Sequence, residues 1–370
     1  MASTGRTTRS GGTRRSRIVA LMTMSPVRDS LVLGSPDALV AALPYLIGFT
    51  PHESLVALWI AAGQIQLTQR LDLAGWSADP GAWEEALWGH PCARTSDSVV
   101  AVAATKGELP SGLLASVRAA ATQRGTALLD VLILDRGRWR SALCHDDHCC
   151  PAVGRLVDPR VHAEVAAEFT IMGAAPSSDR QALVASLARD DVAVKRVASV
   201  LDAAQAPTTR SRSRLESWRD DTIELILARL SPSTEAITNP PLDADDACVV
   251  VGLSDVRVRD TVLWHLAATD PDGLQHALRE LTRLLRAAPD PVVAPVATTC
   301  AVVAWLLGDG ARAGIAVDRA LATAPDYTLA LLVAHSLAAG LPPGSWRAAM
   351  ASVTLDECRN GQANGRRKAG

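Results

Sequence analysis

The stretch from Leu31 to Ile60, LVLGSPDALVAALPYLIGFTPHESLVALWI, constrains the fold of this chain more than any other part of the sequence. It predicts a short strand, a helix and a second strand in immediate succession. Ser35 is a suitable N-cap for the helix and Gly48 offers a left-handed stop after it, while Pro44 inside the helix predicts a kink or an early end. Because residues 54–60 are apolar almost throughout, the second strand is expected to be covered on both faces. The segment therefore predicts the start of an α/β domain.

The alternation of strands and helices continues to about residue 175. The strand over 64–73 is expected to form a hairpin with 54–60 and to lie nearer the sheet edge. Further strands are expected at 98–103, 127–134 and 138–143, and helices at 80–88, 112–123 and 159–172. This order predicts an α/β fold with an N-terminal mixed sheet and flanking helices.

After Gly173 the periodicity is helical, and the rest of the chain is expected to be all-α. The apolar run 247–251 is the one stretch that also fits a strand. Two polar or proline-rich segments, 207–214 and 231–241, are expected to be linkers. Helices are expected at 179–187, 192–204, 215–230, 246–252, 255–268, 271–287, twice within 291–322, and at 326–339.

The stretch from Trp305 to Ala330 matches the second half of a tetratricopeptide repeat. Ala313 and Ala320 are small residues where paired helices must approach closely, and Gly308-Asp309 suits the turn between them. Such units bury their faces only against neighbouring helices. We therefore expect an all-α, tetratricopeptide-like region that forms a small α-solenoid or a helical bundle.

These patterns divide the chain into five segments. They are a disordered basic tail (1–27), an α/β domain with a cysteine cluster (28–175), a helical connector with linkers (176–241), a tetratricopeptide-like helical domain (242–350) and a second disordered tail (351–370). In the first tail arginines alternate with Ser, Thr and Gly, which is typical of disorder. A nucleic-acid or membrane tether is the alternative, as is a later start at Met22 or Met24.

Net charge and hydropathy limit the partners of the protein. A formal net charge of −2 provides no field that steers the chain toward nucleic acid. No apolar run reaches the roughly 18–20 residues of a membrane span, and the apolar piece near the N-terminus is too short for a signal peptide. We therefore expect no membrane or nucleic-acid partner, and a cytoplasmic location in which thiols stay reduced.

The densest set of potential metal ligands is the run Cys144-His145-Asp146-Asp147-His148-Cys149-Cys150. Thiolates suit zinc, so Cys144, Cys149 and Cys150 are the candidate metal ligands and zinc the candidate cofactor. Their spacing is unusual, because structural zinc sites draw ligands from two separate arms; His90 and Cys92 are candidates for the second arm. Redox or thiol chemistry and simple packing of buried cysteines are the alternatives.

A second candidate site lies at Gly34 and Ser35, where a helix begins directly after a strand. Helix N-termini in α/β folds bind anions, so these residues are candidates for ligand binding, although the glycines of a dinucleotide loop and the lysine of a P-loop are missing. Arg70 and Asp72 are interpreted as a surface ion pair at a strand end. Trp83 and Trp88 are expected in the core or at an interface.

Three stretches carry a family resemblance. The run Pro44–Pro51 leading into Glu53-Ser54-Leu55-Val56, the run from Cys144 to Pro151, and Gly308–Ala311 together resemble domain of unknown function 4192, a mainly actinobacterial family. The resemblance covers about residues 28–346. Two positions depart from it: His52 replaces a more acidic or polar residue, and Gln69–Asp72 fits only loosely. The resemblance implies a cytoplasmic actinobacterial protein and brings no activity.

Three functional hypotheses remain. The first is a non-catalytic ligand- or protein-binding module whose C-terminal helices bind a protein partner, since helical repeats present extended recognition surfaces. The alternative is a metal- or thiol-dependent enzyme centred on Cys144, Cys149 and Cys150. A third hypothesis is an α/β enzyme that holds a phosphorylated substrate at the helix start after Gly34. No nucleophile elbow of the type G-x-S-x-G is present, so whether the chain is an enzyme stays open.

Overall fold

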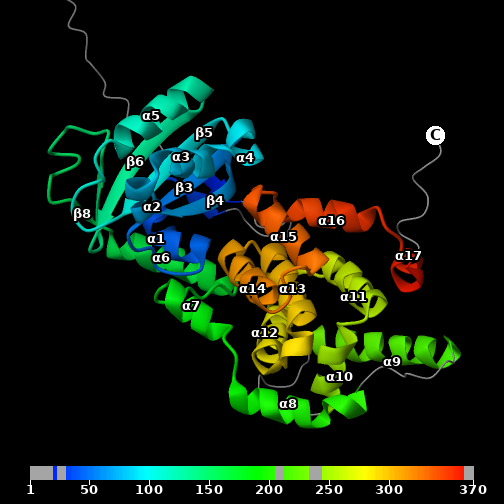
Figure 1. Cartoon of the computed structure of the whole chain (residues 1–370). Coiled ribbons are helices and arrows are strands. Elements are labelled where there is room, and N and C mark those ends of the chain that lie inside the picture. Colours follow the sequence, from blue (N-terminus) through cyan, green and yellow to red (C-terminus); the bar gives the residue numbers. More distant parts are fainter. Residues whose placement is uncertain (1–19, 23–30, 205–211, 233–243, 362–370) are drawn as a thin grey trace, which may run out of the picture.

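The computed structural model describes residues 20–22, 31–204, 212–232 and 244–361, and Figure 1 shows an α/β part beside a helical part. The sheet has the strand order β2-β1-β4-β3-β5-β6-β7-β8. Its strands are β1 (Ala20–Met22), β2 (Leu31–Leu33), β3 (Ser54–Ala61), β4 (Gln64–Asp72), β5 (Ser98–Ala104), β6 (Ala127–Asp135), β7 (Arg138–Ser141) and β8 (Arg155–Leu156).

The sheet is mixed, as the sequence predicts. Strand β3 pairs antiparallel with β4 and with β5, β5 pairs parallel with β6, and β6 and β7 form an antiparallel hairpin. The helices of this part are α1 (Pro36–Ile47), α2 (Leu73–Ala78), α3 (Pro80–Trp88), α4 (Pro91–Thr95), α5 (Leu113–Arg124) and α6 (Pro159–Ile171). The predicted β3–β4 hairpin is confirmed, and only the short strands β1 and β2 lie beyond β4.

The side chains on each face of the sheet pack into a separate buried cluster. Val56 and Leu58 of β3 pack with helix α1 and with Phe169 of α6. The intervening residues, such as Leu55 and Trp59, pack with α2, α3, α4 and α5. Strand β3 is therefore covered on both faces, because successive side chains alternate across a strand.

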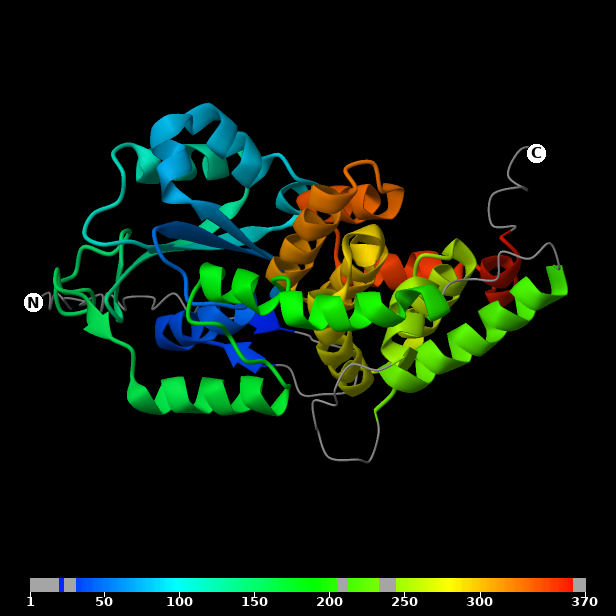
Figure 2. The ribbon, with the colours of Figure 1, turned by 60° about the horizontal axis from the view of Figure 1, so that its bottom comes forward.

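The helical part begins after α6. Its helices are α7 (Arg180–Ser186), α8 (Asp191–Ala204), α9 (Arg212–Leu230), α10 (Ala244–Gly252), α11 (Val256–Ala268), α12 (Pro271–Ala287), α13 (Asp290–Leu306), α14 (Gly310–Thr323), α15 (Thr328–Ala338), α16 (Pro343–Ala351) and α17 (Leu355–Asn360). Figure 2 shows α9 projecting from this part, away from the sheet. None of the described helices is both long and apolar enough to cross a membrane.

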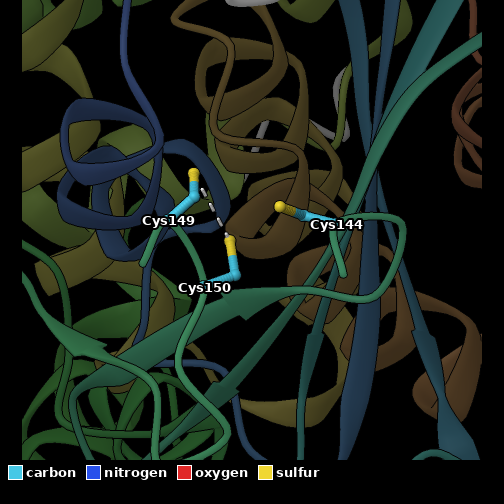
Figure 3. Close-up of side chains that lie close together, drawn as sticks. All are labelled: Cys144, Cys149 and Cys150. Carbon is cyan, nitrogen blue, oxygen red and sulfur yellow. Dashed lines mark hydrogen bonds between the residues drawn. The ribbon is translucent and has the colours of Figure 1, made fainter. Parts of the chain in front are cut away.

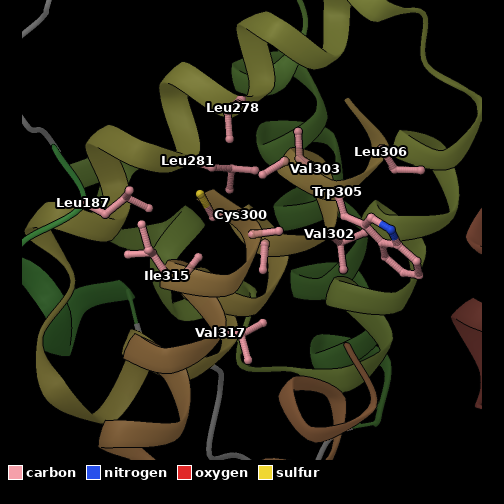
Figure 4. Packing of buried hydrophobic residues seen from close by; sticks show 14 of the residues in the cluster. Leu187, Leu278, Leu281, Cys300, Val302, Val303, Trp305, Leu306, Ile315 and Val317 are labelled. Carbon is pink, nitrogen blue, oxygen red and sulfur yellow. The ribbon is translucent and has the colours of Figure 1, made fainter. Parts of the chain in front are cut away.

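Helix α13 is the centre of the helical part. It lies against α10, α11, α12, α14, α15 and α16, and Figure 4 shows its Cys300, Val302 and Val303 among side chains of neighbouring helices. Ala313 and Ala320 are fully buried, and Gly308 (φ 81°) forms the turn before the N-cap Asp309. Helices before and after α13 in the chain therefore pack around it into one helical unit.

The α/β part and the helical part share one core. A single buried cluster includes Val56 and Leu132 of the sheet, Leu183 of α7, its C-cap Leu187, and residues of the central helix α13. Leu187 lies near Ile315 of α14 in Figure 4. The boundary predicted at residue 176 therefore marks where strands give way to helices, but it does not separate two independent cores.

Several expectations differ from the structure. Helix α1 continues through Pro44 to Ile47, where Gly48 (φ 79°) ends it, so the early end is wrong. The run 247–251 is helical within α10. The short helices α2, α4 and α16 were not predicted.

Both expected tails contain regular structure. Strand β1 lies within 1–27 and pairs with β2 and β4. Helix α17 lies within 351–370, where Thr354 and Glu357 form a capping box and Cys358 is buried. The helix also packs against α11, and such tertiary contact is what stabilises so short a helix. The remainder of both tails, and most of the linkers expected at 207–214 and 231–241, lie outside the described residues.

Candidate functional site

The candidate site is the loop that follows β7. Its three cysteines, Cys144, Cys149 and Cys150, place their sulfur atoms within 4.8 Å of one another, and Figure 3 shows Cys144 facing the other two across the loop. The Sγ atoms of Cys149 and Cys150 are 3.9 Å apart. Cys149 is exposed, whereas Cys144 and Cys150 are partly buried. The structure thus joins the three residues that the sequence nominated as metal ligands.

Asp146 gives the loop its shape. Its backbone carbonyl accepts hydrogen bonds from the amides of Cys149 (3.0 Å) and Cys150 (2.7 Å). Its carboxylate accepts the amide of His148 at 2.9 Å. These bonds close a tight turn that brings two adjacent cysteines opposite Cys144, even though adjacent residues of an extended chain point apart.

Ser141, the last residue of β7, anchors the loop to the sheet. Its hydroxyl donates to the carboxylate of Asp130 on β6 at 2.6 Å and accepts the amides of Leu143 and Cys144 at 3.1 Å each. Burial raises the pKa of the Asp130 carboxyl, and the hydrogen bonds from Ser141 and from the Val131 amide lower it in part. The position of Cys144 therefore depends on the hydrogen-bonded pair of Ser141 and Asp130, which lie on two different strands and form no recognisable sequence motif.

The thiol of Cys150 is protonated at neutral pH in the metal-free protein. Burial raises its pKa to about 11, a backbone hydrogen bond from Ser141 lowers it, and the neighbouring thiols of Cys144 and Cys149 raise it. Since the thiolate is the nucleophile of cysteine chemistry, Cys150 is a weak nucleophile without a bound cation.

This shift predicts how Cys150 affects stability at high pH. Its folded-state pKa lies above the value of about 8.5 for an unfolded chain, so its contribution is present below that value and is lost as pH rises toward 11. We expect the free energy of unfolding of metal-free protein to fall more steeply between these pH values than that of Cys150→Ser. Urea unfolding at several pH values in this range measures the free energy of unfolding of both proteins. The same fall with pH in the parent and in Cys150→Ser would contradict the prediction.

The second arm expected from His90 and Cys92 is wrong. Cys92 belongs to the cluster on the α2–α5 face of the sheet, whereas Cys150 packs against the cluster on the opposite face. His90 Nε2 hydrogen-bonds Gln69 Oε1 (3.2 Å), and its Nδ1 accepts the amide of Ala93 (3.1 Å). Burial lowers the pKa of His90, so its imidazole is a satisfied, neutral core group.

The two histidines inside the loop do not approach the sulfur atoms. His145 and His148 are exposed, and His148 Nδ1 lies 3.7 Å from a carboxylate oxygen of Asp146. Within the described chain, the group of potential ligands consists of the three cysteines alone.

The predicted ligand site at the start of α1 is occupied by the protein's own groups. The Ser35 hydroxyl accepts the amide of Ala38 at 3.2 Å, as an N-cap does. The Asp37 carboxylate in the first turn accepts the indole N–H of Trp139 at 2.8 Å. A carboxylate already lies at the positive end of the helix dipole, which disfavours a second anion there. The role of Gly34 and Ser35 in ligand binding stays a prediction.

The other nominated residues have structural environments. Arg70 pairs with Asp72 at the end of β4, and its guanidinium lies 5.7 Å from the centre of the Phe49 ring. Trp83 and Trp88 are buried in the cluster of the α2–α5 face, which confirms the core interpretation.

Two stretches that carry the family resemblance meet at the junction of the α/β and helical parts. A Cβ atom at Gly48 would lie 3.3 Å from Asp309 Oδ1 and 3.9 Å from Ala311 Cβ. Phe49 forms a bridge with Ser177, and the amide of Ser177 donates to the Gly48 carbonyl at 2.8 Å. The resemblance therefore includes residues that fix how the two parts of the chain pack.

A mixed sheet with helices on both faces, a cysteine loop and a packed helical bundle define the class of this protein. The model of the family described as Domain of unknown function (DUF4192) matches residues 36–344, and the chain belongs to this family. The match extends from α1 to α16 and includes the cysteine loop. No curated protein and no solved structure matches the chain.

Proposed function

We propose that this chain is a non-catalytic binding module whose cysteine loop holds one thiophilic metal ion, with zinc as the first choice. The observation that carries the proposal is the convergence of the three sulfur atoms of Cys144, Cys149 and Cys150 within 4.8 Å. Such convergence needs a specific turn, because two of the three residues are adjacent in sequence.

The spacing of the sulfur atoms fits a tetrahedral ion. Zn–S bonds of about 2.3 Å give a tetrahedron whose edges are about 3.8 Å long. The Cys149 and Cys150 sulfur atoms are 3.9 Å apart, so small side-chain rotations bring all three onto one ion. Water or one of the exposed loop residues, His145 or His148, is available for the fourth position.

A structural role suits the loop better than thiol catalysis. The thiol of Cys150 has a raised pKa, whereas reactive cysteines have lowered ones. Three short hydrogen bonds already shape the turn around Asp146, and a bound ion would hold its two sides together. The competing proposal of a metal- or thiol-dependent enzyme rests on one feature, the fourth coordination position, which no side chain of the described residues occupies.

Metal analysis of the reduced protein tests the proposal. We expect one equivalent of zinc, and its loss in the double variant Cys149→Ser, Cys150→Ser. Cys248→Ala, at a partly buried cysteine of α10, is the matched control and is expected to keep the metal. A protein that takes up no zinc, or a double variant that keeps it, would overturn the proposal.

Cobalt substitution separates the structural proposal from the catalytic alternative. The absorption spectrum of the cobalt protein reports the ligand set. In a structural site a protein side chain fills the fourth position. For the structural proposal we therefore expect added azide or cyanide to leave the spectrum unchanged. A spectrum that changes with these anions, together with hydrolytic activity that depends on Cys144, would favour the enzyme.

We also propose that the C-terminal helices bind a protein partner. In the tetratricopeptide-like interpretation, α13 and α14 are the paired helices of one unit and α15 begins the next. Leu332 on α15 is 58 % exposed, so it is accessible to a partner that contacts these helices. Photo-crosslinking from position 332 in cells, compared with the exposed position Ala322, tests this, and equal labelling at both positions would count against it.

A further inference from the structure

A cleft of about 750 Å³ opens beside the cysteine loop. Its walls come from three segments that lie far apart in the sequence: the β5–α5 loop at Gly107 and Glu108, the β6–β7 hairpin, and residues 152–154. The volume is within the range of about 300–1,000 Å³ typical of small-molecule sites. The cleft lies at the carboxyl ends of the parallel strands β5 and β6, which is where open α/β sheets bind ligands.

Arginines dominate the charge of the cleft. Arg136, Arg138 and Arg140 line it, together with the carboxylates of Asp135 and Glu108. Arg138 and Arg140 are two residues apart on β7, so they lie on the same face of the strand. They are opposite Asp135 and Ile133 of β6 in the hairpin register.

The carboxylates leave part of this positive charge uncompensated. Asp135 is paired with Arg136 at 3.2 Å, and that hydrogen bond is the main cause of its lowered pKa. Arg138 donates to the backbone carbonyl of Gly154 at 3.1 Å. Arg140 is partly buried and has no ion-pair or hydrogen-bond partner among the described residues. No nitrogen of Arg140 is among the buried unpartnered atoms of the described residues, so its guanidinium is solvated and accessible to a ligand.

The arrangement of these groups favours a phosphate. A planar guanidinium binds two oxygens of a phosphate at once, and two arginines on one strand face can share one phosphoryl group. Ile133 and Val153 add an apolar wall beside the arginines, which would contact the uncharged part of a ligand.

We propose that this cleft binds a small phosphorylated ligand through Arg138 and Arg140. The proposal does not rest on the metal site, because no described cysteine lines the cleft and the arginines are held by the β6–β7 pairing. The site also differs from the start of α1, where Asp37 occupies the helix end.

Isothermal titration of the full chain with pyrophosphate and with ATP tests this proposal. We expect both to bind, and Arg138→Ala and Arg140→Ala each to weaken binding by about tenfold or more. Arg140→Lys keeps the charge but loses the two-pronged contact and is expected to give an intermediate loss. Arg118→Ala, at an exposed arginine of α5, is the matched control and is expected to bind as the parent does.

Melting curves of each variant show whether it is folded before binding is compared. Three results would overturn the proposal. The first is no binding of either compound up to about 10 mM, and the second is affinity that Arg140→Ala and Arg140→Lys leave unchanged. The third is citrate binding as tightly as pyrophosphate, which would show attraction of any polyanion. A short single-stranded oligonucleotide could also be titrated. If it binds far more tightly than ATP and its binding depends on Arg140 in the same way, the ligand of the cleft is nucleic acid and the proposal of a small phosphorylated ligand is wrong.

Discussion

Replacing Arg283 by methionine is expected to lower the free energy of unfolding by about 3–5 kcal/mol. Arg283 binds the carboxylate of Asp246 with both terminal nitrogens, at 2.9 and 2.7 Å, and Asp246 is only 1 % exposed. Burial lowers the pKa of Arg283, but hydrogen bonds and the charge of Asp246 outweigh this and raise it overall. Removing the guanidinium takes both of these hydrogen bonds from a buried carboxylate, one oxygen of which also lies 3.9 Å from Arg229.

Urea unfolding of the variant and its controls measures this effect. Arg279→Met, at an exposed position of the same helix, is expected to change stability by less than about 0.5 kcal/mol. The double variant Asp246→Leu, Arg283→Met is expected to regain part of the loss, because two apolar groups need no compensation. An Arg283→Met protein as stable as the Arg279→Met protein would show that the ion pair contributes nothing.

The second large effect is expected at Ser141. Ser141→Ala removes the donor to the Asp130 carboxylate and the acceptor for two amides of the cysteine loop. Unsatisfied buried groups cost about 1–3 kcal/mol each, so a loss of about 2–3 kcal/mol is expected after partial solvation. Zinc affinity is expected to fall by about tenfold or more, as is usual when a residue that supports a metal ligand is removed.

The pH dependence of this loss has a definite sign. Burial raises the pKa of Asp130 and the Ser141 hydroxyl opposes the shift, so the variant raises that pKa further. A group with a raised folded-state pKa stabilises the fold when protonated and loses that contribution as pH rises. The deficit of Ser141→Ala is therefore expected to be larger at pH 7 than near pH 4.

Denaturant titrations at both pH values, with zinc titration of the same samples, make the comparison. Ser336→Ala is the control, because its hydroxyl only donates to the Leu332 carbonyl within α15. If Ser141→Ala loses the same free energy of unfolding at both pH values, or if its zinc affinity is unchanged, Ser141 does not hold the cysteine loop in place.

Local signals predicted most of the secondary structure. The Ser35 cap and the Gly48 stop delimit α1 within a few residues, and both act through hydrogen bonds and backbone angles that are set locally. Helices α2, α4 and α17 were missed because five or six residues are too few to show a periodic pattern.

The run 247–251 shows where tertiary contacts override local preference. Its valines favour a strand, yet the segment is helical within α10, where Val249 and Val250 are fully buried. Asp246, in the first turn of α10, binds Arg283 of α12. The helix is therefore stabilised by partners 30 or more residues away, which a local window does not contain.

The candidate site was predictable in its residues and not in its geometry. Cysteine content nominated Cys144, Cys149 and Cys150, but their convergence depends on the turn around Asp146 and the anchor at Ser141. The second arm was wrong because Cys92 and Cys150 pack with buried clusters on opposite faces of the sheet. The face that a loop reaches depends on how the chain crosses between strands, which is not a local property of the sequence. The arginine cleft was missed because its walls come from three separate segments.

The sequence by itself determined the order and type of most elements, the α/β-to-helical division and the family. Capping, periodicity and turn preferences act over a few residues, so a linear sequence contains them in full. Only the tertiary structure decided that the two parts share one core, that Gly48 meets Asp309, and which charges and thiols lie together. Those facts depend on contacts between residues far apart in the chain, whose energies exist only once the chain has folded.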